Sequence, residues 1–175
     1  MMKDKIPILI LAFILFLANS SYAQQKKLDT DLVIGASIPE LYHIGIRFHY
    51  IPNARIDFNF GSDFKHDPNG IIYAVTFNHA YYVGKVDSKV NQKLWSINSG
   101  FSFLVEANDL QKSTVGYLNL FLAREFPVSK KIFIQPELGA SYFLFEDIIN
   151  TEDVITNGYR VKLIPKFGLN LIVKI

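Results

Sequence analysis

Residues 159–175, YRVKLIPKFGLNLIVKI, form the stretch of sequence that decides the fold. Every second residue from Val161 onward is apolar, and the interleaved positions hold all the charges of the stretch: Arg160, Lys162, Lys166 and Lys174. Successive side chains of a strand point to opposite faces, so this pattern predicts one long strand with an apolar face and a polar face. Strands of soluble proteins usually have about 5–6 residues, whereas a tilted strand needs about 9–11 to cross a bilayer. The length therefore favours a strand that spans a membrane.

Seven further segments alternate in the same way, at residues 32–38, 41–50, 54–61, 71–83, 94–105, 113–126 and 131–145. Connections of hairpin length join most of them, and the last connection, at 146–158, is the longest. No apolar period of 3.6 residues extends over a useful length after the N-terminal region, so essentially no helix is expected there. Eight strands joined by hairpins predict an all-β fold, namely an eight-stranded antiparallel up-and-down β-barrel.

The beginning of the chain has the three parts of a secretory signal peptide. Lys3 and Lys5 give a basic start, residues 6–18 are apolar, and small residues stand at the cleavage positions Ser21 and Ala23. The apolar run is shorter than the roughly 20 residues that a membrane-spanning helix needs. We therefore predict three parts: a cleaved signal peptide at 1–23, a short periplasmic lead at 24–31 and a barrel domain at 32–175.

Composition excludes several classes of protein. The 175-residue chain contains no cysteine, so it has neither disulfides nor an acylated N-terminal cysteine as a membrane anchor. It has 18 basic and 16 acidic residues, and loss of the first 23 residues removes two lysines and one aspartate. The remaining net charge of +1 argues against a nucleic-acid partner, which would require a clustered basic face.

The direction of the apolar faces separates a membrane barrel from a soluble one. In a soluble lipocalin-like barrel the apolar set points inward, whereas in an outer-membrane barrel it meets lipid and the polar set fills the interior. The apolar sets here hold side chains too large for a narrow interior. The polar sets contain small residues that suit a crowded interior: Gly35, Gly45, Gly61, Gly100, Gly139 and Gly168. Aromatic residues near strand ends are consistent with girdles at two membrane interfaces: Tyr42, Tyr50, Tyr81, Tyr82, Trp95 and Tyr159. These features favour a transmembrane barrel.

The region 32–175 resembles the small eight-stranded outer-membrane barrels of Gram-negative bacteria, the OmpA/OmpX-like family with an outer membrane protein beta-barrel domain. The signal peptide, the eight alternating segments and the last strand carry the resemblance. Residues 167–175, FGLNLIVKI, resemble the signal that the barrel-assembly machinery reads. The chain departs from the pattern because it ends on Ile175 rather than on an aromatic residue. Pro136 and Pro165 also stand mid-strand, where each removes a ladder hydrogen bond and a bulge is the easier site.

The resemblance implies a porin-like fold in the outer membrane of a Gram-negative bacterium. Outer-membrane lipid and lipopolysaccharide would surround a monomer, and the barrel-assembly machinery would bind it during insertion. If the N-terminus starts in the periplasm, the connections near residue 51, at 84–93 and at 127–130 are periplasmic. The connections near residue 39, at 65–70, at 106–112 and at 146–158 then face outward.

Charged side chains on the inward faces predict a closed lumen. The interior of an eight-stranded barrel is just wide enough to be filled by side chains, and buried charges need partners. We expect Arg47 or Arg55 to pair with Asp57, and Lys162 or Lys166 to pair with Glu137. The predicted structural network that fills the lumen consists of Arg47, Arg55, Asp57, Glu137, Lys162 and Lys166, with Glu125, His43 and His49 on the same faces.

The sequence favours a structural or adhesive interaction role over catalysis. No cofactor or metal ion is expected, because there is no cysteine, the four histidines are scattered and the carboxylates lack EF-hand spacing. A lipid-modifying outer-membrane enzyme, of the lipid A deacylase or acyltransferase type, is one alternative. Its candidate residues have no recognisable nucleophile–base spacing: His43, His66, Asp67 and Ser141. A soluble periplasmic barrel that binds an apolar ligand in its interior is the second alternative. The sequence nominates no extracellular partner.

Overall fold

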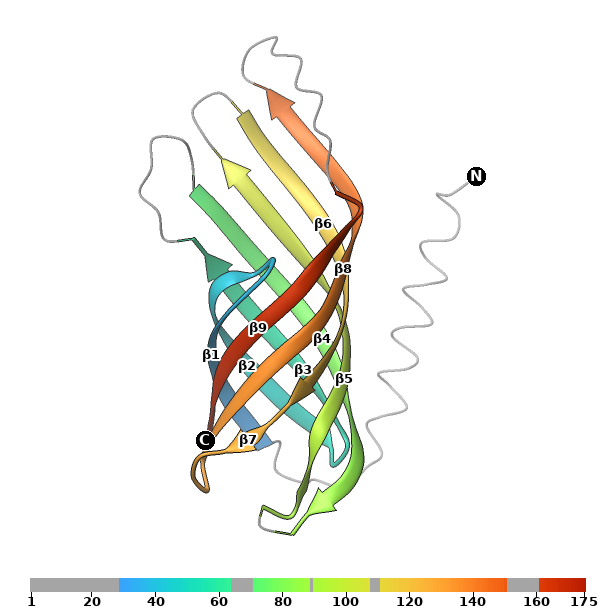
Figure 1. Ribbon diagram of the computed structural model, residues 1–175. Coiled ribbons are helices and arrows are strands. Elements are labelled where there is room, and N and C mark those ends of the chain that lie inside the picture. The colour runs from blue at the N-terminus through green and yellow to red at the C-terminus, as the bar shows by residue number, and fades with distance from the viewer. Residues whose placement is uncertain (1–28, 64–70, 89, 108–110, 151–160) are drawn as a thin grey trace.

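A computed structural model describes residues 29–63, 71–88, 90–107, 111–150 and 161–175 (Figure 1). The predicted signal peptide at 1–23 and residues 24–28 of the predicted lead lie outside the described residues. The described strands are, in chain order, β1 (Asp29–Ser37), β2 (Leu41–Ile51), β3 (Ala54–Ser62), β4 (Ile71–Asp87), β5 (Gln92–Ala107), β6 (Gln111–Arg124), β7 (Phe126–Pro127), β8 (Ile132–Asn150) and β9 (Leu163–Lys174). No helix in this part of the chain is long and apolar enough to cross a membrane.

The strands form one antiparallel sheet that closes on itself. Each strand from β1 to β5 pairs with the next in sequence, β1 also pairs with β9, and β9 pairs with β8. The pairing of β6 with β8 completes the ring. The two-residue strand β7 continues β6 after Glu125 and pairs with the start of β8, so β6 and β7 share one position. The ring therefore has eight strands, and the predicted antiparallel up-and-down barrel is confirmed.

Several strands extend further than the alternation predicted. β4 continues to Asp87, β8 runs to Asn150, and β1 begins at Asp29, within the predicted lead. These strand ends carry more polar residues than the strand centres and break the apolar alternation, and backbone pairing does not depend on the polarity of side chains. The alternation marks the part of the wall with an apolar outer face, whereas the hydrogen-bonded ladder continues beyond that part.

Pro136 and Pro165 lie in regular ladders and not at bulges. The register shifts of the sheet occur elsewhere, between His49 and Ile51, Val83 and Val86, and Gly116 and Tyr117. Pro136 lies opposite the interruption between β6 and β7, and Pro165 lies beyond the end of the β1–β9 ladder. Each proline therefore has one side without a paired strand, where the missing N–H removes no ladder bond.

The barrel is apolar outside and polar inside. The side chains of Phe58, Phe101, Phe167 and Leu169 are 50%, 44%, 51% and 57% exposed on the outer wall, whereas Arg47, Asp57 and Lys166 are 1%, 5% and 1% exposed. This is the arrangement of a membrane barrel and the opposite of a soluble one. Tyr42, Tyr81 and Trp95 are exposed on the outer wall as predicted for girdle residues, but Tyr82 is buried and belongs to the interior. Tyr159 lies outside the described residues.

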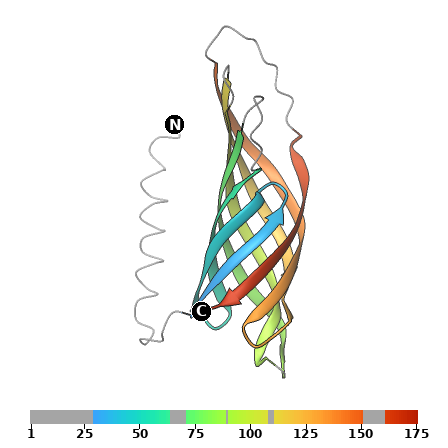
Figure 2. The ribbon, with the colours of Figure 1, turned by 90° about the vertical axis from the view of Figure 1, so that its left-hand side faces the viewer.

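The two ends of the barrel differ in height. The first and last described residues of the barrel, Asp29 and Ile175, lie at one end, hereafter the terminal end, together with the turns 52–53 and 128–131. Toward the opposite end, hereafter the far end, the turn between β1 and β2 lies well below the tops of β4, β5, β6 and β8 (Figures 1 and 2). The β1–β2 hairpin is therefore the low side of the ring.

The interior near the far end is apolar. A buried cluster, hereafter the apolar cap, lies on the inner faces of the strands toward the far end: Ala74, Leu104, Val115 and Tyr117, with Ile72, Phe143 and Ile164 packed against them. The prediction of a lumen filled by polar side chains did not include this layer. The interior is thus polar over most of its length and apolar where the walls are tallest.

Candidate functional site

Two arginines from neighbouring strands form the first half of the polar lumen. Arg47 on β2 and Arg55 on β3 are 1% and 0% exposed, and the Nε of each donates to Asp57 Oδ1 at 3.1 Å. Arg47 Nη1 donates to Glu125 Oε1 at 3.0 Å, and Arg55 Nη1 donates to the same oxygen at 2.9 Å. Two cations thus share two carboxylates. These residues, with Tyr82 and Gln135, are called the arginine cluster below.

Glu125 is the acceptor on which the arginine cluster converges. It lies between β6 and β7, on the side of the ring opposite the two arginines in the strand order. Its Oε1 also accepts from the Tyr82 hydroxyl at 2.6 Å, and Gln135 Oε1 accepts from Arg47 Nη2 at 2.8 Å. Charge-assisted hydrogen bonds of this kind are about twice as strong as neutral ones. The cluster therefore joins β2 and β3 to β6 and β8 across the interior.

A lysine and a turn residue form the second half of the polar lumen. Lys166 Nζ on β9 donates to both carboxylate oxygens of Glu40 at 2.5 Å, and the two side chains are 1% and 2% exposed. Glu40 Oε2 accepts from Ser37 Oγ at 2.5 Å, and Glu40 Oε1 accepts from Ser102 Oγ at 3.2 Å. Asn119 Nδ2 donates to Ser102 Oγ at 2.6 Å. These five residues are called the lysine cluster below.

The backbone of the β1–β2 turn brings Glu40 into the lumen. Leu41 has a φ of 62°, which is the left-handed region and uncommon for a residue other than glycine. The turn crosses close to β3, since a Cβ at Gly61 would lie 2.0 Å from the carbonyl oxygen of Glu40. Only glycine allows this approach. The low hairpin therefore places a carboxylate over Lys166 instead of presenting it to solvent.

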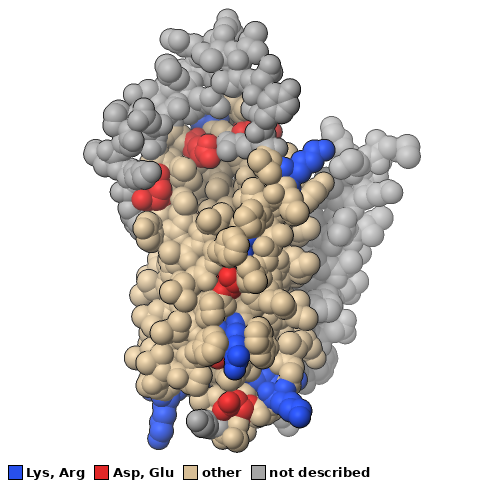
Figure 3. All heavy atoms as spheres, viewed as in Figure 1, with Lys and Arg blue, Asp and Glu red and all other residues tan. Residues whose placement is uncertain are grey.

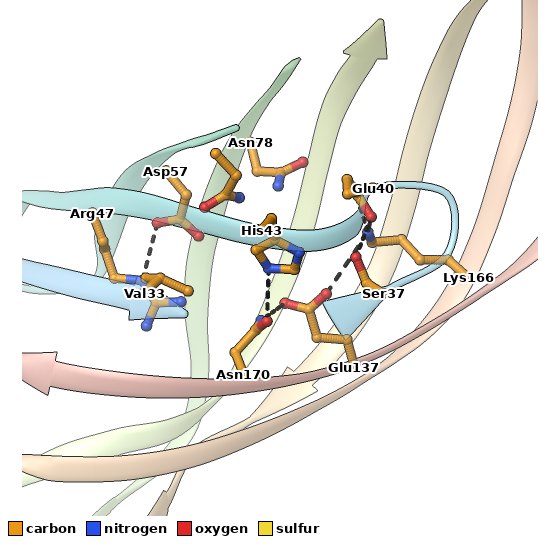
Figure 4. A pocket seen from close by; sticks show the side chains of 11 residues that line it. Val33, Ser37, Glu40, His43, Arg47, Asp57, Asn78, Glu137, Lys166 and Asn170 are labelled. Carbon is orange, nitrogen blue, oxygen red and sulfur yellow. Dashed lines mark hydrogen bonds and ion pairs between the residues drawn. The ribbon is translucent and has the colours of Figure 1, made fainter. Parts of the chain in front are cut away.

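Glu137 links the lysine cluster to a chain of polar side chains. Its Oε2 lies 3.7 Å from Lys166 Nζ, further than Glu40 does. Its Oε1 accepts from Asn170 Nδ2 at 2.7 Å, and Asn170 Oδ1 lies 2.9 Å from His43 Nε2. The His43 Nδ1 lies 3.2 Å from the Leu41 carbonyl oxygen. Figure 4 shows this chain reaching from β2 to β8 beside Glu40 and Lys166.

Little space remains between the two clusters. The cavity bordered by His43, Asp57, Asn78, Glu137 and Lys166 has a volume of about 10 Å³ (Figure 4). A cavity needs roughly 10–15 Å³ to hold one water molecule. The buried Oδ1 atoms of Asn59 and Asn78, which also border it, have no hydrogen-bond partner. This part of the described lumen therefore has room for about one water molecule.

The structure brings together most of the predicted lumen residues but changes their pairing. Arg47, Arg55, Asp57, Glu137 and Lys166 are in the lumen. Lys162 is not, because β9 begins at Leu163 and the lysine before it is exposed. Lys166 binds Glu40 more closely than Glu137, and the arginines share Glu125 as well as Asp57. Glu40 had been assigned to a turn and left out of the network.

The predicted catalytic candidates are engaged in separate interactions. Ser141 Oγ donates to Asn119 Oδ1 at 2.6 Å, whereas His43 contacts Asn170 and the Leu41 carbonyl. His66 and Asp67 lie outside the described residues. His49, also on an inward face, lies 2.8 Å from Asp31 Oδ2 near the terminal end. In the described ranges no three histidine or acidic side chains are grouped as a metal ion would require.

Comparisons with known proteins agree with this architecture. The chain is similar to the crystal structure of the N-terminal β-barrel domain of OprF from Pseudomonas aeruginosa, with 13% sequence identity and a TM-score of 0.52, over 85% of this chain and 96% of that chain. The crystal structure of CarO from Acinetobacter baumannii matches with 9% identity and a TM-score of 0.48, over 83% of this chain and 96% of that chain. The sequence matches no model of a protein family and no curated protein. This chain therefore has the fold of the small outer-membrane β-barrels of the OmpA-like kind.

Proposed function

We propose that this protein is an integral outer-membrane barrel with a closed lumen, whose role is structural or adhesive rather than catalytic. The single observation that carries the proposal is the inverted burial, with large apolar side chains exposed around the wall and arginine, lysine and carboxylate side chains buried inside. Such a wall is unfavourable in water, because soluble monomers rarely expose contiguous apolar patches of this extent. The same wall is favourable in contact with lipid.

The distribution of charge on the surface supports a membrane-spanning belt. Over the face drawn in Figure 3, the stretch between the two ends consists mostly of other residues, with a few small charged patches in it. The exposed apolar side chains come from every strand position of the ring, including Ile44 on β2, Val75 on β4, Leu120 on β6 and Leu138 on β8. An outward apolar band about 25 Å tall is what a transmembrane barrel requires.

The interior supports a non-conducting barrel. The arginine cluster fills the lumen in one half, the lysine cluster fills it further along, and the apolar cap follows toward the far end. The cavity between the clusters has a volume of about 10 Å³, which leaves no path for a hydrated ion and no room for an apolar ligand. A rigid closed barrel of this kind is suited to hold connecting loops in place, and loops on a rigid scaffold commonly carry recognition.

Fractionation tests the location first. We expect the protein to remain in the membrane pellet after extraction with alkaline carbonate, to float with outer-membrane lipid in a sucrose gradient and to dissolve only in detergent. Its mobility on a denaturing gel should change on boiling, as the closed barrel opens. Recovery in the aqueous periplasmic extract without detergent would instead identify a soluble barrel and refute the proposal.

Two further measurements test the role. Purified barrel inserted into a planar lipid bilayer should give no stepwise conductance, because the lumen is filled. Mass spectrometry of lipid A from cells with and without the gene should show the same acyl pattern. A reproducible change in acyl chains that follows the gene would favour the lipid-modifying enzyme over the structural role.

A further inference from the structure

Arg124 differs from the other arginines that the structure describes. Arg47 and Arg55 point into the lumen, whereas Arg124, at the end of β6, faces outward beside Trp95 of β5, its partner in the ladder. Trp95 and Phe126 are 45% and 43% exposed on the outer wall. The side chain therefore lies on the lipid-facing surface, at the terminal end of the barrel.

Two aromatic rings hold the guanidinium group of Arg124. Its Cζ lies 5.1 Å from the centroid of the Trp95 ring and 4.7 Å from the centroid of the Phe126 ring. Contacts within about 6 Å of a ring centroid are attractive, and they are strongest for tryptophan. Because both rings come from the barrel wall itself, the planar group is fixed in orientation before any ligand binds.

The positive charge of Arg124 has no counterion in the described part of the chain. None of the ion pairs there involves it. Its Nε is buried without a hydrogen-bond acceptor. The neighbouring Glu125 does not compensate for it, since that carboxylate points into the lumen and binds Arg47 and Arg55. A fixed guanidinium in a lipid-facing wall thus lacks the anion that such groups usually bind.

The surroundings indicate which anion fits. An exposed tryptophan at the edge of an apolar belt marks the level of lipid headgroups. The anion available at that level is the phosphate of a glycerophospholipid, and guanidinium groups bind phosphate through two parallel hydrogen bonds. Lys130 and Lys131, exposed in the turn 128–131 between β7 and β8, add positive charge at the same end.

We propose that Arg124, clamped between Trp95 and Phe126, forms a binding site for the phosphate of one glycerophospholipid of the periplasmic leaflet. The site rests on the proposed membrane location and goes beyond it, because it predicts one specific lipid position on the wall. It requires no movement of the barrel and no contact with the lumen.

Native mass spectrometry of the full chain, released from non-ionic detergent micelles with a fixed fraction of dioleoylphosphatidylglycerol, tests the proposal. We expect the native chain to retain one phospholipid molecule, and dioleoylglycerol, which lacks the phosphate, not to be retained. Arg124→Gln should weaken retention about tenfold, which corresponds to about 1.4 kcal/mol. Retention of the phospholipid by Arg124→Lys should lie between that of the native chain and that of Arg124→Gln, because lysine keeps the charge but lacks the planar guanidinium group. Lys112→Gln, which removes an exposed charge near the far end, is the matched control and should retain lipid like the native chain.

Three results would overturn the site: equal retention by Arg124→Gln and the native chain, equal retention by Arg124→Lys and the native chain, or retention of dioleoylglycerol as strongly as the phospholipid. Circular dichroism and the boiling-dependent gel shift establish that each variant is folded. Flotation of Arg124→Gln with membranes separates the two proposals. A folded variant that floats but loses the phospholipid supports both, whereas a native chain that fails to float refutes the membrane location by itself.

Discussion

The two ionic clusters of the lumen compensate their buried charges in different ways. In the arginine cluster, two cations face two carboxylates, and each guanidinium binds both Asp57 and Glu125. At the lysine cluster, the single ammonium of Lys166 faces two carboxylates: Glu40 of the cluster at 2.5 Å and the neighbouring Glu137 at 3.7 Å. The arginine cluster has as many positive as negative charges, and each arginine has two carboxylate partners. The lysine cluster, with Glu137 beside it, has one carboxylate more than its fixed cation can neutralise.

This difference implies that the buried carboxylates of the barrel contribute unequally to the free energy of unfolding. Removal of one partner from a balanced buried pair leaves a charge without compensation, whereas removal of a surplus carboxylate leaves a balanced pair. A glutamate-to-glutamine substitution keeps the size and an acceptor oxygen and removes only the charge. The same substitution at Glu125, Glu40 and Glu137 therefore separates the two clusters.

Glu125→Gln should have the largest effect. It leaves Arg47 and Arg55 with Asp57 as their only carboxylate and removes the charged acceptor that both Nη1 atoms use. We expect the free energy of unfolding to fall by about 3–5 kcal/mol, the usual cost of an uncompensated buried charge. Urea unfolding in lipid vesicles, followed by the fluorescence of the single tryptophan, measures it. Asp147→Asn, at an exposed position on β8, is the control and should change stability by less than about 1 kcal/mol.

Parity along the strands predicted which charges of the arginine cluster point inward, and the reason is geometric. Arg47, Arg55 and Asp57 lie within β2 and β3, where successive side chains point to opposite faces. Parity could not predict the pairing with Glu125, because the stagger of strands around the ring decides which residues meet across the lumen. The prediction of aromatic girdles misplaced Tyr82, although alternation along β4 places this residue on the inward face.

Glu40→Gln should have an intermediate effect. Lys166 would lose a charged acceptor at 2.5 Å but would keep the carboxylate of Glu137, now as a balanced pair. We expect the free energy of unfolding to fall by about 1.5–3 kcal/mol, the range for one hydrogen bond to a charged group. The same urea titration checks it. A loss as large as that for Glu125→Gln would show that Glu137 cannot take over and that the clusters do not differ.

The sequence could not predict that Glu40 points into the lumen, and the reason is physical. Alternation assigns faces only to residues in strands, and Glu40 lies in the turn between β1 and β2. Its direction depends on the left-handed φ of Leu41 and on the close approach of the turn to Gly61. Lys162 is exposed for a related reason, because β9 begins only at the next residue, Leu163. The apolar cap was missed because hydropathy does not tell an inward apolar residue near a rim from an outward one.

Ser141→Ala should have a small effect, because Ser141 lies beside the lysine cluster and binds its neutral member Asn119. It removes the hydrogen bond from Ser141 Oγ to Asn119 Oδ1 at 2.6 Å, while Asn119 keeps its bond to Ser102. We expect a loss of about 1 kcal/mol, as for one neutral buried hydrogen bond. Ser99→Ala on the exposed outer wall is the matched control and should leave the urea midpoint unchanged. An equal shift for both variants would mean that Ser141 contributes no bond to stability.

Glu137→Gln should have the smallest effect on the free energy of unfolding. The sign of that effect tests whether the two clusters differ. Lys166 would keep Glu40, its closer partner, and the glutamine oxygen could still accept from Asn170 Nδ2. Because the substitution removes the surplus carboxylate, we expect the free energy of unfolding to stay within about 1 kcal/mol of the native value or to rise. A loss close to that for Glu125→Gln would mean instead that Glu137 is not a surplus carboxylate and that the two clusters do not differ. The same urea titration decides between these outcomes.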